Sequence, residues 1–212
     1  MEWQLVIFDL DGTLLNTISD LGHACNYALE KLGLPQHPID AYNRMVGNGL
    51  RKMVERAAPE ADTETIDRLL VLCKEYYDKH CMDTTKPYPG IPELLQTLNE
   101  KGVKLAVASN KYQEAVERIV RHYFPEIPFI AVEGQREGRP IKPDPTIITN
   151  IIESAGLPKE SVAMVGDSVV DIEMARRAGV TSIAVSWGFS SAADLEPCHP
   201  DYLITEPRQP QP

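Results

Sequence analysis

Seven polar side chains in this chain have the types and positions that chemistry on a charged ligand would need. Two of them, Asp9 and Asp11, directly follow an apolar run near the start of the chain. A carboxylate can act as a nucleophile, and a second one beside it can act as a general acid and base. The other candidates come from segments far away in the sequence: Ser109, Asn110, Lys142, Asp167 and Asp171.

Four of these seven side chains are carboxylates, and carboxylates in one site repel each other unless a cation neutralises them. An oxygen-rich set of this kind suits Mg²⁺, which keeps several waters and also binds the phosphate of a substrate. The residue types therefore predict a magnesium site with Asp9, Asp11, Asp167 and Asp171 as candidate ligands. Lys142 would add a positive charge to this site.

The segments between these residues have sequence patterns that predict alternating strands and helices. Short apolar runs predict buried strands, and amphipathic patterns between them predict helices. This alternation is typical of an α/β fold with a Rossmann-like parallel sheet, whose ligands bind beyond the carboxyl ends of the strands. The strands are expected at 5–8, 103–108, 129–132, 162–165 and 182–185, and the helices at 91–100, 112–122, 145–155 and 169–178.

The alternation is interrupted by a segment that lacks any convincing strand. Three helix-like stretches, roughly 18–32, 40–58 and 63–81, predict an all-helical domain inserted after the first strand. We call this predicted domain, residues 15–83, the cap. The core domain is then expected at 1–14 and 84–205, and a disordered tail at 206–212. Two linkers side by side would allow a hinge, and a hinged cover over the strand ends would exclude water.

Composition and charge narrow the class of protein. The chain has 212 residues and a net charge of −10, which argues against nucleic acid and anionic membranes as partners. No apolar run is long enough to span a bilayer, the first residues do not resemble a secretory signal, and the four cysteines are scattered. We therefore expect a cytoplasmic protein, and the oligomeric state is left open.

Each candidate residue also has a purely structural interpretation. Asp11 with Gly12 could form only a turn, Ser109 and Asp167 or Ser168 could cap helices, and Asp171 could favour a helix dipole. Lys142 could be a solvated loop lysine. Together, these interpretations do not explain why Asp9 ends an apolar strand. They also do not explain why polar groups fall at three strand ends in one plausible geometry.

The same residues lie in four motifs that resemble those of the haloacid dehalogenase-like hydrolase superfamily. The motifs occur in the order of that superfamily and span most of the chain, and the helical insertion resembles its helical cap of the first type. Ser109 stands where phosphatases of this group usually have threonine, a change that keeps the hydroxyl. The motifs are FDLDGTL at 8–14, ASNK at 108–111, KPDP at 142–145 and GDSVVD at 166–171.

The resemblance implies a mechanism for hydrolysis of a phosphate ester, with a small phosphorylated metabolite as the expected substrate. Asp9 would attack phosphorus and form an aspartyl-phosphate, while Asp11 would protonate the leaving group and then activate water. Mg²⁺ would be held by Asp9, by the main-chain carbonyl of Asp11 and by Asp167, with Asp171 positioning the metal or its waters. Ser109 and Asn110 would bind the phosphoryl group. Lys142 would neutralise charge on Asp9 and on the phosphoryl group.

A glycine-rich loop in the cap gives the only indication of the substrate. Gly47, Asn48 and Gly49 would let the backbone approach a ligand, and Arg51 could pair with an anionic substrate tail, although this stretch could also simply begin a helix. The loop and the later Glu55–Arg56–Ala57 resemble the cap of phosphoglycolate phosphatases. Phosphoglycolate is therefore the favoured substrate.

Two other functions remain open at this stage. A β-phosphoglucomutase-like phosphotransferase would share all four motifs and the cap, and His23 stands where such a cap could place a base. A non-enzymatic binding protein on the same scaffold is disfavoured, because decayed members typically lose Asp9 or Asp11. Dehalogenation is disfavoured because a halide leaves without a proton, whereas Asp11 supplies one.

Overall fold

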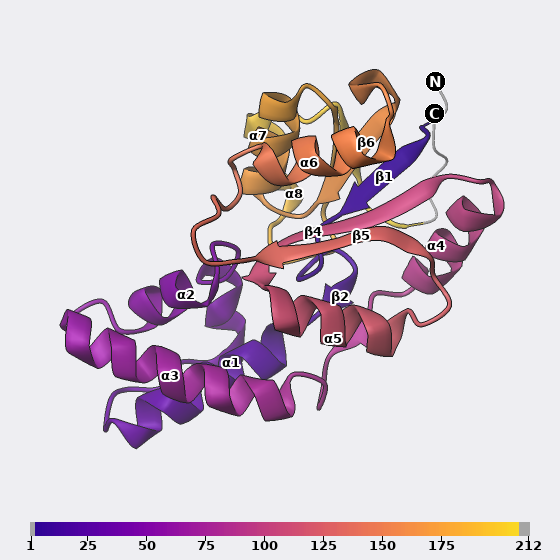
Figure 1. The fold of residues 1–212 in the computed structure, drawn as a ribbon. Helices are drawn as coiled ribbons and strands as arrows, with labels where there is room; N and C mark the ends of the chain where they lie inside the picture. Colours follow the sequence, from indigo (N-terminus) through magenta and orange to yellow (C-terminus); the bar gives the residue numbers. More distant parts are fainter. Residues whose placement is uncertain (1–2, 208–212) are drawn as a thin grey trace.

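The computed structural model describes residues 3–207, and these residues form a parallel sheet flanked by helices together with a group of cap helices (Figure 1). The sheet has six strands in the order β5-β4-β1-β6-β7-β8, and every neighbouring pair is parallel. This confirms the predicted α/β fold. The strands are β1 (Leu5–Phe8), β4 (Lys104–Tyr112), β5 (Phe129–Gln135), β6 (Val162–Gly166), β7 (Thr181–Val185) and β8 (Tyr202–Ile204).

The central strands β1 and β6 are apolar and buried along their whole length because helices cover both faces of the sheet there. In β1, Val6 and Phe8 belong to the core on the side of α4 and α5, whereas Leu5 and Ile7 pack with residues of α6 and α7. Figure 1 shows these two helical layers on opposite sides of the sheet. The core helices are α4 (Ile91–Glu100), α5 (Gln113–Tyr123), α6 (Thr146–Ala155), α7 (Val169–Ala178) and α8 (Ala192–Leu195), with short 3₁₀ turns η2 (Lys159–Ser161) and η3 (Glu196–Cys198).

The cap consists of four helical segments that follow β1 in the chain. They are α1 (Ile18–Lys31), the 3₁₀ helix η1 (Ile39–Arg44), α2 (Leu50–Ala57) and α3 (Thr63–His80). The predicted single helix at 40–58 is wrong, because a loop separates η1 from α2. Gly47 and Gly49 have φ of +104° and +82° in this loop, a left-handed backbone that glycine adopts readily and that interrupts a helix.

The two linkers between cap and core are joined to each other. Strand β2 (Leu15–Asn16) pairs antiparallel with β3 (Lys86–Pro87). Asp20, in the first turn of α1, is buried and accepts hydrogen bonds from the backbone N–H groups and hydroxyls of Thr84 and Thr85. The boundaries predicted at 14/15 and 83/84 lie beside this pairing and stay a prediction.

Other details of the core differ from expectation. Strand β4 runs four residues beyond the predicted end at Ala108 and so includes Ser109, Asn110 and Lys111. Strand β5 also runs further, to Gln135, and β8 was not predicted. Of the predicted tail 206–212, residues 208–212 lie outside the described residues.

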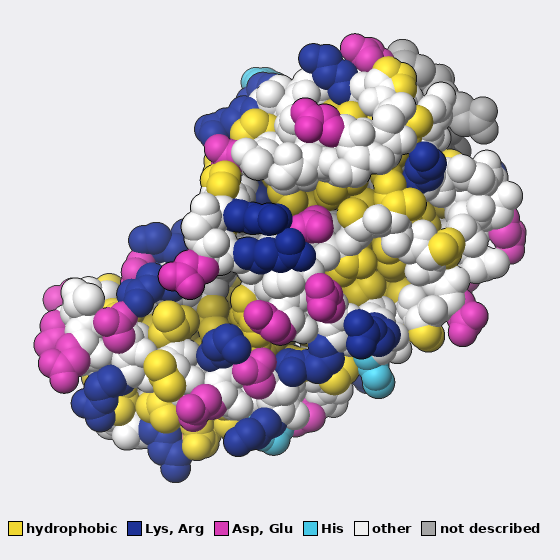
Figure 2. All heavy atoms as spheres, in the orientation of Figure 1, with side chains coloured by type: hydrophobic (Ala, Val, Ile, Leu, Met, Phe, Trp, Pro, Cys, Tyr) yellow, Lys and Arg dark blue, Asp and Glu magenta, His cyan; other side chains and the backbone are white. Residues whose placement is uncertain are grey.

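The surface mixes both signs of charge. On the face drawn in Figure 2, acidic and basic side chains alternate over the cap helices. In the part of the chain that the structure describes, no helix is long and apolar enough to cross a membrane.

Candidate active site

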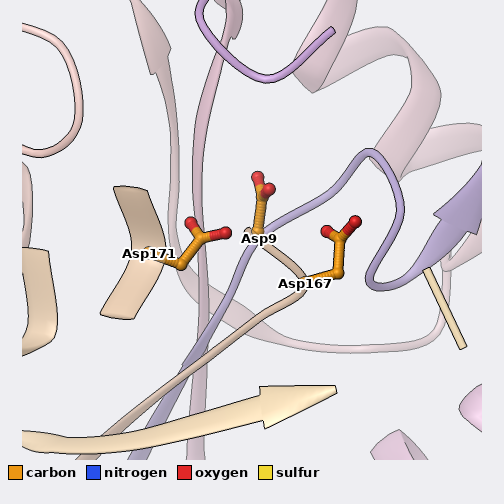
Figure 3. A group of neighbouring side chains, drawn as sticks. All are labelled: Asp9, Asp167 and Asp171. Atoms are coloured by element: carbon orange, nitrogen blue, oxygen red, sulfur yellow. The ribbon is translucent and has the colours of Figure 1, made fainter. Parts of the chain in front are cut away.

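Three carboxylates meet at the carboxyl edge of the sheet. Asp9 follows β1, Asp167 follows β6, and Asp171 lies in the first turn of α7. One oxygen of each lies within 4.8 Å of the others, and all three side chains are buried. Figure 3 shows Asp167 and Asp171 on either side of Asp9. The ends of β1 and β6 and the start of α7 therefore bring three of the four predicted carboxylates together. Their role as metal ligands stays a prediction.

One lysine connects two of these carboxylates. The Nζ atom of Lys142 lies 2.9 Å from Oδ1 of Asp9 and 2.7 Å from Oδ1 of Asp171, and its side chain is buried. Burial disfavours the ammonium, but the carboxylates of Asp171 and Asp9 outweigh it and raise the pKa of Lys142 above its ordinary value. Lys142 therefore stays charged beside the site.

A single ammonium does not balance three buried carboxylates. Burial raises the pKa of Asp9 to about 7, with a further increase from Asp171, although Lys142 opposes the shift. Burial, Asp9 and Asp171 raise the pKa of Asp167 well above its ordinary value. Such shifts mean that the site resists full ionisation without more positive charge. A divalent cation with oxygen ligands fits this donor set and this excess of negative charge.

The carboxylate of Asp167 is held by two hydrogen bonds, and it packs so closely against two glycines that larger residues would not fit at their positions. It accepts a hydrogen bond of 2.9 Å from the Thr13 hydroxyl and one of 2.8 Å from the Phe189 backbone N–H. Gly12 has φ of +86°, and a Cβ at Gly12 or at Gly188 would collide with the Asp167 side chain. Glycine is therefore required at Gly12 by both its backbone and its surroundings.

Asp11 is held apart from the three-carboxylate group. Its Oδ2 accepts from Lys111 Nζ at 2.8 Å, and its Oδ1 accepts from the Thr17 hydroxyl at 2.8 Å. The Asp11 side chain is not part of the carboxylate cluster. This placement agrees with an acid–base role for the side chain and leaves only the main chain of Asp11 for a metal.

A small cavity separates these residues from the cap. Its volume is about 40 Å³, enough for a few water-sized atoms. The core contributes Asp9, Asp11 and the end of β4, and the cap contributes a largely apolar wall. The lining residues from the cap are Leu21, Val46, Gly47, Gly49, Leu50, Met53 and Tyr77.

Comparison with known proteins assigns the family. Residues 6–185 match the family model described as haloacid dehalogenase-like hydrolase. The chain belongs to the haloacid dehalogenase-like hydrolase family. It is 34% identical to a phosphoglycolate phosphatase of Mesorhizobium japonicum, over 97% of this chain and 95% of that protein. It is 32% identical to a phosphoglycolate phosphatase of Aquifex aeolicus, over 96% and 93% of the two chains.

Solved structures agree with this assignment. A predicted phosphoglycolate phosphatase from Lactobacillus delbrueckii subsp. bulgaricus superposes with a TM-score of 0.93 at 32% identity, covering 99% of this chain and 97% of the other. One from Haemophilus somnus gives a TM-score of 0.90 at 27% identity, covering 98% and 96%. The predicted family, and the prediction of an enzyme similar to its phosphatases, are thereby confirmed.

In this haloacid dehalogenase-like hydrolase, β4 presents the predicted phosphoryl-binding residues to the cavity. Ser109 and Asn110 are buried and line it. Asn110 accepts from the Lys142 backbone N–H at 2.9 Å and donates to the Gly47 carbonyl at 2.9 Å. Asn110 therefore ties the lysine loop to the cap loop, and the Ser109 hydroxyl proton stays available for a ligand.

The predicted cap residues divide into two groups. Gly47 and Gly49 line the cavity. Asn48 instead accepts a hydrogen bond of 2.6 Å from Arg56, and Arg51 pairs with Asp67 and lies 3.9 Å from Glu55. Asn48 and Arg51 are not among the cavity-lining residues. Their part in substrate binding stays a prediction.

Among the lining residues that the sequence did not predict, Lys111 and Tyr77 carry polar groups next to Asp11 or one another. Lys111 is the last residue of the motif at 108–111, where it received no role, and the extension of β4 buries it. Tyr77 reads as part of the apolar face of α3, and it is indeed fully buried. The only sequence signal was the position of Lys111 directly after the strand-end pair Ser109–Asn110.

Proposed function

We propose that this chain is a magnesium-dependent phosphatase that hydrolyses a small phosphorylated metabolite, with phosphoglycolate favoured, through an aspartyl-phosphate. The observation that carries the proposal is the meeting of Asp9, Asp11 and Ser109 at one cavity, with Lys142 paired to Asp9. This set provides a nucleophile, an acid–base group, a phosphoryl-binding hydroxyl and a fixed positive charge.

One carboxylate oxygen of Asp9 is free to act as the nucleophile. Its Oδ1 accepts from the Leu10 N–H at 2.7 Å and from Lys142, and within residues 3–207 its Oδ2 accepts no hydrogen bond. Oδ2 would bond to phosphorus as the ester oxygen leaves, and Asp11 would give that oxygen a proton. Asp11 would then take a proton from water, which attacks phosphorus and breaks the bond to Asp9. The products are the alcohol and inorganic phosphate.

The residues present fit magnesium. Asp9, Asp167 and the main chain of Asp11 would hold it, while Asp171, tied to Lys142, would position its surroundings. When bound, the ion would offset negative charge on the carboxylates and on the phosphoryl oxygens.

Two observations support a phosphoglycolate phosphatase over a mutase that acts on a sugar phosphate. The first curated relatives carry the name phosphoglycolate phosphatase. A mutase needs a base on the cap, but His23 is exposed, and no histidine is among the described residues that line the cavity.

The test is phosphate release by the purified protein from 2-phosphoglycolate, sugar phosphates and nucleotides, with magnesium or with EDTA. We expect release from 2-phosphoglycolate that EDTA abolishes and added magnesium restores. Isomerisation of glucose 1-phosphate without phosphate release would reject the hydrolase. Turnover that is unaffected by EDTA would reject the metal requirement.

A further inference from the structure

A buried hydroxyl in the active-site cavity has no partner. Tyr77 on α3 has no exposed surface, yet its hydroxyl is one of two buried side-chain polar atoms in residues 3–207 without a hydrogen bond. Buried polar groups are nearly always paired, so an exception calls for an explanation. Tyr77 lines the same cavity as Asp9 and Asp11, which makes a bound ligand the natural partner.

A buried cation lies over the ring of this tyrosine and lines the same cavity. Lys111 Nζ lies 4.6 Å from the centre of the Tyr77 ring, and the side chain of Lys111 is only 4% exposed. An ammonium has three N–H donors, and the Asp11 carboxylate takes one of them. Lys111 and Tyr77 therefore offer unused donors on one side of the cavity.

The rest of the cap side offers little to a polar ligand. Leu21, Val46, Leu50 and Met53 form an apolar wall there. Burial and the nearby Asp11 raise the pKa of Tyr77 well above its ordinary value, so its hydroxyl stays protonated and acts as a donor. A substrate group at this place must then be an acceptor of hydrogen bonds and is favoured if it is anionic.

We propose that Tyr77 and Lys111 bind the carboxylate of a short phosphorylated hydroxy acid while Asp9 and Ser109 engage its phosphoryl group. The proposal rests on the proposed function and names the residues that select its substrate. Tyr77 and Lys111 line the same cavity as Asp9 and Ser109, so a short chain would join the two anionic ends of such a substrate. Tyr77 and Lys111 thus take the role that the sequence suggested for Arg51, whose guanidinium pairs with Asp67.

Tyr77→Phe tests this assignment because it removes only the unpartnered hydroxyl. The substrates are 2-phosphoglycolate and ethyl phosphate, which has a methyl group where the acid has its carboxylate. We expect kcat/KM for 2-phosphoglycolate to fall about 10- to 100-fold, as for loss of a hydrogen bond to a charged group, and kcat/KM for ethyl phosphate to change less than about threefold. Because no protein hydrogen bond is lost, the melting temperature should stay equal or rise.

The matched control is Tyr76→Phe, which removes the neighbouring hydroxyl on α3 outside the cavity and should leave both substrates unaffected. Equal losses on both substrates with Tyr77→Phe, or no loss on 2-phosphoglycolate, would overturn the proposal. A fall in melting temperature together with equal losses would show a structural role instead.

A second measurement separates this proposal from the choice of substrate. 3-Phosphonopropionate, which has the same spacing of carboxylate and phosphorus as 2-phosphoglycolate, and propylphosphonate are compared as inhibitors of p-nitrophenyl phosphate hydrolysis. If the wild-type protein releases no phosphate from 2-phosphoglycolate, the proposed substrate fails. Stronger inhibition by 3-phosphonopropionate than by propylphosphonate, lost in Tyr77→Phe, would still support the carboxylate site. Equal inhibition by the two compounds in the wild-type protein would reject it.

Discussion

Replacing Asp9 with asparagine removes one negative charge from the active site and keeps the size and shape of the side chain. The asparagine oxygen can keep the hydrogen bonds that Oδ1 of Asp9 accepts from Leu10 and Lys142. An amide cannot act as the nucleophile, so phosphate release should be lost. In the absence of magnesium, however, the variant should be more stable than the wild-type protein, because one of three crowded carboxylates has become neutral.

The pH dependence of this gain follows from the raised pKa of Asp9. In the folded protein the pKa is about 7, against an ordinary value of 3.8. Below pH 3.8 the carboxyl of Asp9 is protonated in both the folded and the unfolded state, and it does not change the free energy of unfolding. Between pH 3.8 and pH 7 the folded state holds a proton that the unfolded state has lost. The free energy of unfolding therefore falls as the pH rises through this range. At about 1.4 kcal/mol per pKa unit, the cost is about 2 kcal/mol near pH 5 and about 4 kcal/mol near pH 8.

The assay is thermal and urea unfolding of both proteins in EDTA at about pH 5 and about pH 8. For a chain of this length, about 1 kcal/mol corresponds to roughly 2–4 °C in melting temperature. Asp40→Asn, which neutralises an exposed carboxylate in η1, is the control and should change little. The reasoning is refuted if Asp9→Asn is no more stable than wild type near pH 8. It is also refuted if the gain does not shrink towards pH 5.

Three further substitutions test separate parts of the structure. Asp11→Asn should abolish hydrolysis of alkyl phosphates yet retain some phosphorylation by an activated aryl or acyl phosphate; equal losses would contradict its acid role. Lys142→Met should abolish turnover and lower the free energy of unfolding by about 3–5 kcal/mol at neutral pH, since it leaves buried carboxylates unpaired. An unchanged urea unfolding curve would contradict the stabilising role of Lys142. Asp20→Asn should lower the free energy of unfolding by about 2–3 kcal/mol and speed hydrogen exchange at the backbone N–H groups of Thr84 and Thr85, which donate to Asp20. Unchanged exchange at these two residues would show that Asp20 does not hold the second linker in place.

The centre of the sheet was predictable because strands such as β1 and β6 are buried on both faces. The continuous apolar run at 5–8, with Val6 facing one helical layer and Leu5 the other, is the sequence pattern of such a strand. The three-residue edge strand β8, Tyr202–Ile204, lacks this double burial and gave no signal. In the cap, the helical pattern of 40–58 concealed the break at Gly47 and Gly49, because periodicity does not record backbone φ.

The core of the site was predictable for a topological reason. Asp9 and Asp167 follow parallel strands, Ser109 lies near the carboxyl end of a third, and these ends share one edge of the sheet. The contacts of Lys111 and Tyr77 depend instead on how the cap packs against β4. Two residues so far apart in sequence, each with an ordinary structural interpretation, cannot be paired without the tertiary structure.

The pairing of β2 with β3 brings the entry and exit of the cap to one point beside the sheet. The chain crosses from Leu15 and returns at Pro87, so the length and content of the intervening helices are decoupled from the geometry of the strand ends. Evolution or a designer could exchange this module, or replace it by a tight hairpin, and leave the aspartates undisturbed. Such exchanges of the cap would change the substrate specificity and leave the arrangement of the aspartates as it is.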